Sequence, residues 1–280
     1  MKAVVLRSTG GVGALRVEEV ECPQPAEGEV LIRVAATAVD PVEWKIRRDL
    51  VAHEPPAVLG ESVAGTVEVS NAAGFAAGDD VFGVATSGAQ AEYAVAPALS
   101  IARKPDGVTF EHAAALPVSA TTAWQGLFDC GRLERGQTVL VAGSTGGVGD
   151  LAVQLARRAG ARVIDRTRSD VADDVRDVDV ALDTVGGATT SALLAVVREG
   201  GTLVTVASPP EPAACSHRVW VKTLVAKPNP ATLVLIGELV ASAALRVEIA
   251  DRLSLNDLSR VHDLGESWHA PGTIILAPAA

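Results

Sequence analysis

The chain has 280 residues, of which 48% are hydrophobic, and its 34 acidic and 24 basic side chains give a formal net charge of -10. This length exceeds the size at which one core usually stops growing, so we expect two domains. The acidic balance and the scattered Lys and Arg residues argue against a nucleic-acid surface. The N-terminus lacks the apolar core of a signal peptide, and no uncharged apolar stretch approaches the length of a membrane span. We therefore expect a cytoplasmic protein with neither a nucleic-acid nor a membrane partner.

The spacing of the cysteines indicates neither disulfide bonds nor a metal site. Cys22, Cys130 and Cys215 are far apart in the sequence and have no C-x-x-C spacing. We expect neither a disulfide scaffold nor a cysteine zinc site.

The first hundred residues show short β-type runs separated by Gly, Pro and Asp. The predicted strands are residues 2–7, 29–39, 62–70, 79–85 and 91–97. This pattern is typical of an antiparallel β domain. Residues 111–129 are then predicted to be helical in two pieces, broken near Pro117, because proline ends or kinks a helix.

From residue 138 onward, predicted strands alternate with predicted helices. The strands are residues 138–143, 161–165, 177–185 and 201–208, and the helices are residues 146–160 and 189–200. Such alternation indicates a parallel sheet covered on both faces. A helix over residues 231–245 and an isolated strand over residues 272–278 follow, so we expect the tail to return to the first domain.

The stretch TVLVAGSTGGVG, residues 138–149, runs from a buried strand into a glycine-rich turn. Gly146 and Gly147 would let a pyrophosphate approach backbone N–H groups at the positive end of a helix dipole. Gly149 would let the helix pack closely on the strand. The spacing is G-x-G-x-x-G with Ser144 in the first glycine position, and its strand-turn-helix context favours a nucleotide site. A glycine-rich turn without a ligand is the alternative.

Several segments resemble a known family. They are LRVEEVECPQPAEGEVLIRVAATAVDPVEWKIR, VLGESVAGTVE, LPVSATTAWQGLFD, VLVAGSTGGVGDLAVQLARRAGARVI, DVALDTVGG and GTLVTVAS. Together they resemble the medium-chain dehydrogenase/reductase superfamily and, within it, the zinc-independent quinone oxidoreductase-like branch, which includes NADPH-dependent enone reductases.

The resemblance implies an α/β fold with two domains. A GroES-like antiparallel β domain would comprise residues 1–112 and 250–280, and a shortened Rossmann-type parallel sheet domain would comprise residues 113–249. It further implies NADPH outside the carboxyl ends of the parallel strands and a small-molecule substrate in the cleft where the domains meet.

The resemblance also bears on zinc. Zinc-dependent relatives bind a catalytic metal through Cys, His and Cys or Asp, and the matching positions in this chain are Asp40, Glu61 and roughly Val118. An aliphatic side chain cannot bind zinc, and two carboxylates alone make a poor zinc site. We therefore expect no metal.

The same comparison predicts an acidic cluster. The branch commonly has N-P-x-D beside the nicotinamide, whereas this chain has DPVE, and a second position usually held by a small polar residue is Glu61. Asp40, Glu43 and Glu61 are candidate catalytic residues, since repulsion and desolvation would raise at least one carboxyl pKa. Alternatively, Glu43 pairs with Arg47 and Glu61 with a neighbouring cation.

Three further residues are candidates for the substrate pocket. They are Trp44, His53 and Trp124. Large aromatic side chains are more often part of a core, so a packing role is the alternative.

The stretch VIDRTRSD, residues 163–170, should select the adenosine ribose. Asp165 lies about twenty residues beyond the glycine turn, where an acid favours NAD. Arg166 and Arg168 could instead grip a 2′-phosphate and favour NADP. A third possibility is that this strand is a splice of the family's second and third strands with the 2′-phosphate loop removed, in which case NADPH binding is weakened or lost.

The full set of candidate cofactor residues follows from the turn and the resemblance. It comprises Thr122, Ser144, Gly146, Gly147, Val148, Arg166, Arg168, Val185 and Ala207.

Two functions remain open. The first is an NADPH-dependent oxidoreductase that transfers hydride to an enone or quinone-type substrate without zinc. The alternative is a redox-silent family member that uses the interdomain cleft for non-redox acid/base chemistry, such as a cyclisation, or for binding. A third possibility is a scaffold or regulatory protein with no chemistry. The family resemblance also implies a homodimer, formed through the strand HRVWVKT near Val219, since an exposed apolar edge invites pairing.

Overall fold

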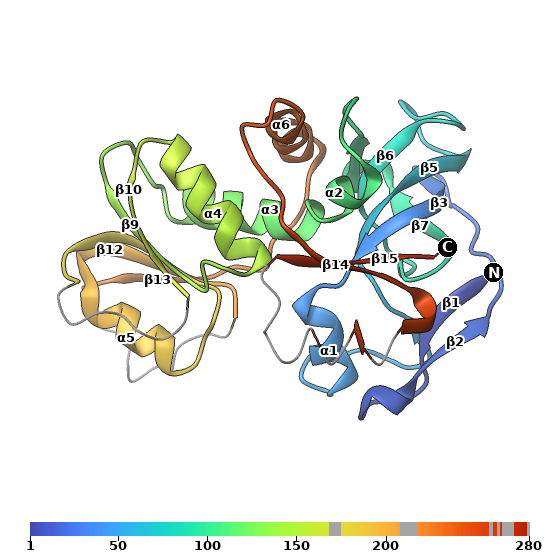
Figure 1. The fold of residues 1–280 in the computed structure, drawn as a ribbon, viewed down its shortest axis with the longest axis horizontal. Helices are drawn as coiled ribbons and strands as arrows, with labels where there is room; N and C mark the ends of the chain where they lie inside the picture. The colour runs from blue at the N-terminus through green and yellow to red at the C-terminus, as the bar shows by residue number, and fades with distance from the viewer. Residues whose placement is uncertain (168–174, 208–217, 258–259, 262–263, 265–271, 279–280) are drawn as a thin grey trace. The chain divides into compact units, whose positions relative to one another are not determined.

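The computed structural model describes residues 1–167, 175–207, 218–257, 260–261, 264 and 272–278 (Figure 1). They form two compact units: unit 1 is Met1–Val118 with Pro228–Ala280, and unit 2 is Ser119–Lys227. The boundaries expected from sequence, 112/113 and 249/250, differ from this division. The second boundary moves because helix α6 (Pro230–Ala241) packs on unit 1, where Gly237 lies close to Pro105 and Phe82.

A sheet of seven strands dominates unit 1. Its strands are β3 (Glu29–Ala38), β5 (Ser62–Ser70), β6 (Asp80–Val84), β7 (Tyr93–Pro97), β8 (Ile101–Arg103), β14 (Ile249–Ser254) and β15 (Thr273–Ala277). The order is β14-β15-β3-β5-β6-β8, with β7 also pairing with β3. Apart from the parallel pair β14–β15, the pairings are antiparallel, as predicted for this domain.

The return of the tail to the first domain is confirmed. Strand β15 pairs with β3, placing Ile275 opposite Ala38 and Leu276 opposite Thr37. Strand β14, which runs parallel to β15, was not predicted. Its pattern alternates weakly between apolar and polar residues, so periodicity gives little signal.

Besides α6, the described residues of unit 1 form a small sheet and short helices. The sheet has the order β2-β1-β4, with β1 (Lys2–Leu6), β2 (Leu15–Glu19) and β4 (Ala57–Val58). The helices are α1 (Pro41–Arg47), α2 (Phe110–Ala114) and the 3-10 turns Val12–Ala14, Ala98–Ser100 and Leu255–Asp257.

Unit 2 contains a parallel sheet of five strands in the order β10-β9-β11-β12-β13. The strands are β9 (Thr138–Ala142), β10 (Arg162–Arg166), β11 (Val178–Asp183), β12 (Val197–Thr205) and β13 (Trp220–Thr223). Helices α4 (Gly147–Arg158) and α5 (Ala188–Val196) lie on opposite faces of this sheet (Figure 1). The predicted Rossmann-type arrangement, and with it the α/β fold class, is confirmed.

The predicted break at Pro117 is also confirmed. Helix α2 ends at Ala114, and α3 (Pro117–Trp124) begins at the proline. The helix continues as a π-helical turn over Gln125–Cys130. Proline at a first helical position is favoured because its missing N–H would have no intrahelical partner there.

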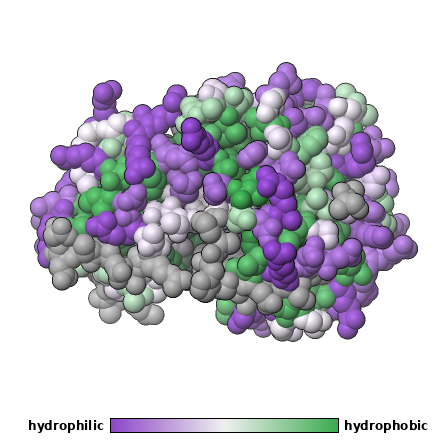
Figure 2. Space-filling view, in the orientation of Figure 1, coloured by the Kyte–Doolittle hydropathy of each residue, from purple (hydrophilic) through white to green (hydrophobic). Residues whose placement is uncertain are grey.

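The surface shown in Figure 2 mixes hydrophilic and apolar residues. Trp220 and Val225, 68% and 81% exposed, are among the large apolar side chains that face solvent. No helix in the described part of the chain is long and apolar enough to cross a membrane. The expected cytoplasmic location stays a prediction.

Candidate functional site

Asp40 lies at the start of α1, two residues after β3 ends. Its side chain is only 3% exposed. The Ser62 hydroxyl donates a hydrogen bond of 2.8 Å to Asp40 Oδ2, and the Thr37 hydroxyl donates to the Ser62 carbonyl at 2.6 Å. Two neighbouring strands and one helix therefore hold this carboxyl group in place.

Glu43, in the first turn of α1, is buried beside Asp40. Its Oε1 accepts a 3.4 Å hydrogen bond from the Asp40 backbone N–H. Its Oε2 accepts from the side-chain amide of Gln90, which is fully buried. The two acids are thus tied together across a single helical turn.

Burial shifts these carboxyl groups toward their protonated forms. It raises the pKa of Asp40 to about 7, a rise that the Ser62 hydrogen bond opposes and the charge of Glu61 increases. It raises the pKa of Glu43 well above the usual range, and the charge of Asp40 adds to that rise. Burial also raises the pKa of Glu61, against the charge of His53. The structure brings Asp40, Glu43 and Glu61 together, whereas their catalytic role stays a prediction.

The alternative pairings can now be compared with observed contacts. The Glu43 carboxylate accepts hydrogen bonds from Asp40 and Gln90, while Arg47 Nη1 donates to the Gly10 carbonyl. The cation that acts on Glu61 is His53, which is itself exposed. These contacts leave both acids close to Asp40.

The predicted substrate-pocket residues lie in different surroundings. Trp44 is 8% exposed and packs in a hydrophobic cluster with residues such as Val4 and Leu276. Trp124 belongs to unit 2 and packs at a tilt against Phe128, with ring centroids 4.7 Å apart. Trp44 therefore has a clear packing role, and substrate contact by these residues stays a prediction.

No group of three or more His, Cys, Asp or Glu side chains in the described residues is arranged to hold a metal ion. Asp40 and Glu61 lie close together, but the third matching position is occupied by Val118. Cys22 and Cys130 are free, and Cys215 lies outside the described residues.

In unit 2 the glycine turn follows β9 as predicted. Gly143 has φ +80°, and a Cβ there would lie 2.1 Å from the Thr184 hydroxyl, so the position requires glycine. The N–H groups of Gly143 and Ser144 donate to the Arg166 carbonyl at 2.8 and 3.0 Å. The turn is thereby fastened to the end of β10.

The outer side of the turn is open. Gly146 precedes α4, and a Cβ added there would have one neighbour within 4 Å in the described structure, the Gly143 carbonyl oxygen at 3.6 Å. Asp150 N donates the first intrahelical bond, to the Gly146 carbonyl, and Gly146 N donates to the Gly143 carbonyl at 3.1 Å. The N–H groups of the first helical residues, 147–149, therefore have no acceptor within the helix. The space and the donors fit a pyrophosphate.

The inner side of the turn is closed. A Cβ at Gly149 would lie 2.1 Å from the Gly143 carbonyl oxygen. Gly149 was expected to allow packing of helix on strand, and the structure shows that the close neighbour is the turn itself.

Of the residues proposed to select the ribose, Asp165 and Arg166 can be placed, and Arg168 lies outside the described residues. Asp165 Oδ2 accepts a 2.9 Å hydrogen bond from Arg157 of α4. Arg166 Nη1 donates to the Asp165 carbonyl. Strand β10 pairs with β9 and stands at one end of the strand order, and eleven residues lie between the end of β10 and the start of β11. This arrangement fits the predicted shortening, whereas weakened cofactor binding stays a prediction.

Asp183 is a structural residue of the site that sequence reasoning missed. It is fully buried at the end of β11, where its Oδ1 accepts from the N–H groups of Val185 and Gly186 at 3.0 and 2.9 Å. Its Oδ2 accepts from the Thr190 hydroxyl at 2.5 Å. An Asp directly before a glycine-containing loop is a signal for this kind of turn.

The loop that Asp183 holds is hydrogen-bonded to the end of β9, just before the glycine turn. The Thr184 hydroxyl donates to the Ala142 carbonyl at 2.8 Å. This hydrogen bond holds the next residue, Val185, 41% exposed, near the carboxyl end of β9. The remaining candidates are Thr122, buried in α3, and Ala207, whose N–H donates to the Thr205 hydroxyl.

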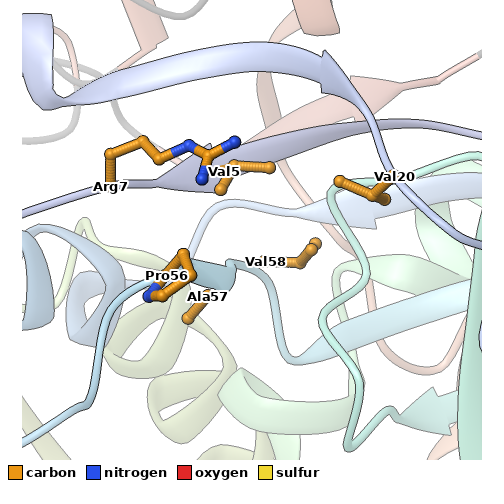
Figure 3. Close-up of a pocket in the computed structure, with 6 residues that line it drawn as sticks. All are labelled: Val5, Arg7, Val20, Pro56, Ala57 and Val58. Atoms are coloured by element: carbon orange, nitrogen blue, oxygen red, sulfur yellow. The ribbon is translucent and has the colours of Figure 1, made fainter.

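A pocket in unit 1 lies elsewhere (Figure 3). It has a volume of about 180 Å³ and is lined by Val5, Arg7, Val20, Pro56, Ala57 and Val58. It is mainly apolar and contains none of the candidate site residues.

Comparisons with known proteins place this chain in a family. A model of the alcohol dehydrogenase GroES-like domain matches residues 26–106, and a model of the zinc-binding dehydrogenase matches residues 159–276. The quinone-oxidoreductase homolog, chloroplastic, of Spinacia oleracea is 30% identical, with 96% of this chain and 95% of that protein covered.

Solved structures give the same result. The quinone oxidoreductase from Coxiella burnetii matches with a TM-score of 0.91 and 26% identity, covering 100% of this chain and 99% of that one. Mycobacterial Rv1454c complexed with NADPH matches with a TM-score of 0.88 and 29% identity, covering 99% of this chain and 100% of that one. The chain belongs to the medium-chain dehydrogenase/reductase superfamily, in its quinone oxidoreductase-like branch.

Proposed function

We propose that the protein is an NADPH-dependent reductase that transfers hydride to an enone or quinone-type small molecule without zinc. The observation that carries the proposal is the open outer side of the glycine turn at Gly146. In a chain of this family, backbone N–H groups left available at a helix start are what a dinucleotide pyrophosphate needs. A mycobacterial relative complexed with NADPH supports the choice of cofactor.

Residues of unit 2 would hold the cofactor. The first turn of α4 binds the pyrophosphate through the N–H groups of Gly147 and Val148, and Ser144 lines the turn. Thr122, Val185 and Ala207 contact the rest of the dinucleotide. When bound, NADPH supplies a hydride from nicotinamide C4. The task of these residues is to orient the cofactor and to exclude water.

Asp40 would provide the proton that completes the reduction. Its pKa of about 7 means that a large fraction of the carboxyl groups carries a proton near neutral pH. The Ser62 hydroxyl donates to Oδ2, so the proton would be carried by the other oxygen, Oδ1. A general acid is most effective when its pKa lies near the working pH.

The test is NADPH oxidation followed by absorbance, with small enones and quinones as acceptors. For the wild type, we expect kcat/KM to fall as pH rises above about 7, because Asp40 loses its proton. Asp40→Asn should lower kcat by about 100-fold, the scale of general acid catalysis, and leave NADPH affinity unchanged. If the protein binds NADPH but reduces none of these acceptors, the reductase proposal is wrong.

The absence of zinc is a separate part of the proposal. Val118 at the third ligand position supports it, since an aliphatic side chain offers no electron pair to a metal. Exhaustive dialysis against a chelator should leave turnover unchanged, and restoration of lost activity by added zinc would contradict this.

Acid/base chemistry without a cofactor is the second candidate. It is favoured by the buried pair Asp40 and Glu43 and by the short connection between β10 and β11. Calorimetric titration separates the two, because a redox-silent protein would show no heat of binding with millimolar NADPH.

We also propose that the protein forms a homodimer through β13. This strand ends the strand order of its sheet, and Trp220 on it is 68% exposed. An exposed apolar edge strand favours pairing with a second copy. Light scattering should give the mass of a dimer for the wild type and of a monomer for Trp220→Asp; a monomeric wild type would contradict the proposal.

A further inference from the structure

We infer that Arg157 determines the preference of the nucleotide site for NADPH over NADH, by engaging the carboxylate of Asp165. This inference rests on the proposed function, because it concerns the same cofactor site. It assigns a specificity role to a residue of α4 that lies outside the glycine turn.

The position of Asp165 relative to the turn comes from the sheet register. Strand β10 runs parallel to β9, with Asp165 opposite Val141 and Arg166 opposite Ala142. The Arg166 carbonyl accepts the N–H groups of Gly143 and Ser144. Asp165 is thus one residue before the point at which β10 is fastened to the phosphate turn, at the carboxyl end of the strand.

A free carboxylate at that place would select against NADPH. It would accept a hydrogen bond from the ribose 2′-hydroxyl of NADH and repel the 2′-phosphate of NADPH. In the structure, Asp165 Oδ2 is instead engaged by Arg157 Nη2 at 2.9 Å. The guanidinium neutralises the carboxylate, and only one of its N–H donors is needed for this contact.

Both side chains remain accessible to a ligand. The side chains of Arg157 and Asp165 are 60% and 48% exposed. The N–H donors of Arg157 that do not face Asp165 can contact a phosphate, for which guanidinium geometry is well suited. The same residue therefore both removes the feature that favours NADH and adds a feature that favours NADPH.

The ion pair between Arg157 and Asp165 can be tested by mutation, because its removal should change the free energy of unfolding very little. Exposed ion pairs contribute little to the free energy of unfolding. Arg157→Ala should therefore change cofactor preference without changing the unfolding midpoint. Arg158, the adjacent arginine on α4, is also exposed and gives a matched control of the same charge change.

The experiment is calorimetric titration of the whole protein with NADPH and with NADH. The measured quantity is the ratio of the NADH Kd to the NADPH Kd. We expect Arg157→Ala to lower this ratio by about tenfold or more, through weaker NADPH and tighter NADH binding. Arg158→Ala should leave the ratio unchanged. In the Arg157→Ala background, Asp165→Ala should abolish the gain in NADH affinity.

The outcomes separate this inference from the proposed function. An unchanged ratio in Arg157→Ala, or an equal change in Arg158→Ala, overturns the role of Arg157 while leaving NADPH binding intact. A wild type that binds neither cofactor overturns the proposed function, and the inference with it.

Discussion

The acidic cluster of unit 1 is buried, whereas the glycine turn of unit 2 is open, and this difference gives the two sites different chemistry. Asp40 and Glu43 are almost completely buried and are held by Ser62 and Gln90, so exclusion of water raises their pKa values. The turn beside Gly146 keeps open space and backbone donors instead. A buried site changes how readily a group holds a proton, whereas an open backbone site provides room for a ligand.

The largest effect should come from closing the turn on its inner side. Gly149→Val places a Cβ 2.1 Å from the Gly143 carbonyl oxygen, a backbone atom that cannot move away cheaply. We expect the free energy of unfolding to fall by at least about 3 kcal/mol, measured by urea denaturation. Wild-type stability in this variant would show that the turn is looser than the contact distances indicate.

Asp183→Ala should come next. It leaves the N–H groups of Val185 and Gly186 and the Thr190 hydroxyl without their acceptor. We expect a loss of roughly 3 kcal/mol in the free energy of unfolding, because buried donors that lose their acceptor are costly. Asp183→Asn keeps one acceptor oxygen and should lose less; equal losses would mean that Asp183 does not act through this hydrogen bonding.

A smaller effect is expected from Asp40, and it depends on pH. The carboxyl pKa is about 7 in the folded protein and about 3.9 in an unfolded chain, so between these values the folded state binds the extra proton. The contribution of Asp40 to the stability of the wild type should therefore fall as pH rises from about 4 to about 7 and stay constant above that.

Asp40→Asn removes this dependence while keeping an oxygen for Ser62. At pH 8 we expect the variant to be more stable than the wild type, and at pH 4 the difference should nearly vanish. Urea denaturation at both pH values measures the change. If the free energy of unfolding changes with pH in the variant as it does in the wild type, the Asp40 carboxyl has an ordinary pKa.

The smallest predicted effect concerns Thr121 in α3. Its hydroxyl is buried and has no hydrogen-bond partner in the described structure. Thr121→Val replaces the hydroxyl by a methyl group of similar size and should raise the free energy of unfolding by about 1 kcal/mol, measured by thermal or urea denaturation. A loss of stability would indicate that the hydroxyl has a partner after all.

The sequence was informative where the signal is local. The strand-turn-helix at the glycine turn, the break at Pro117 and the isolated strand near the C-terminus follow from periodicity and from the backbone demands of Gly and Pro. The family resemblance predicted the clustering of Asp40 and Glu43, and the structure brings them together because they are three residues apart at a helix start.

Long-range partners could not be read from the sequence. Gln90 contacts Glu43 across 47 residues, and Arg157 reaches Asp165 from a different element. Asp183 was overlooked although it follows an apolar strand and precedes two glycines. Such contacts depend on how elements pack, which periodicity within one segment does not report.

The most direct test of the account compares NADPH binding by the wild type and by Gly146→Ala. A Cβ at Gly146 would meet one atom of the described protein, at an ordinary distance of 3.6 Å, yet it would occupy the space assigned to the pyrophosphate. We predict that the wild type binds NADPH in a calorimetric titration and that Gly146→Ala binds at least about tenfold more weakly, with an unchanged unfolding midpoint. Equal affinity in the two proteins, or no binding by the wild type, would contradict the assignment of this turn as a dinucleotide site.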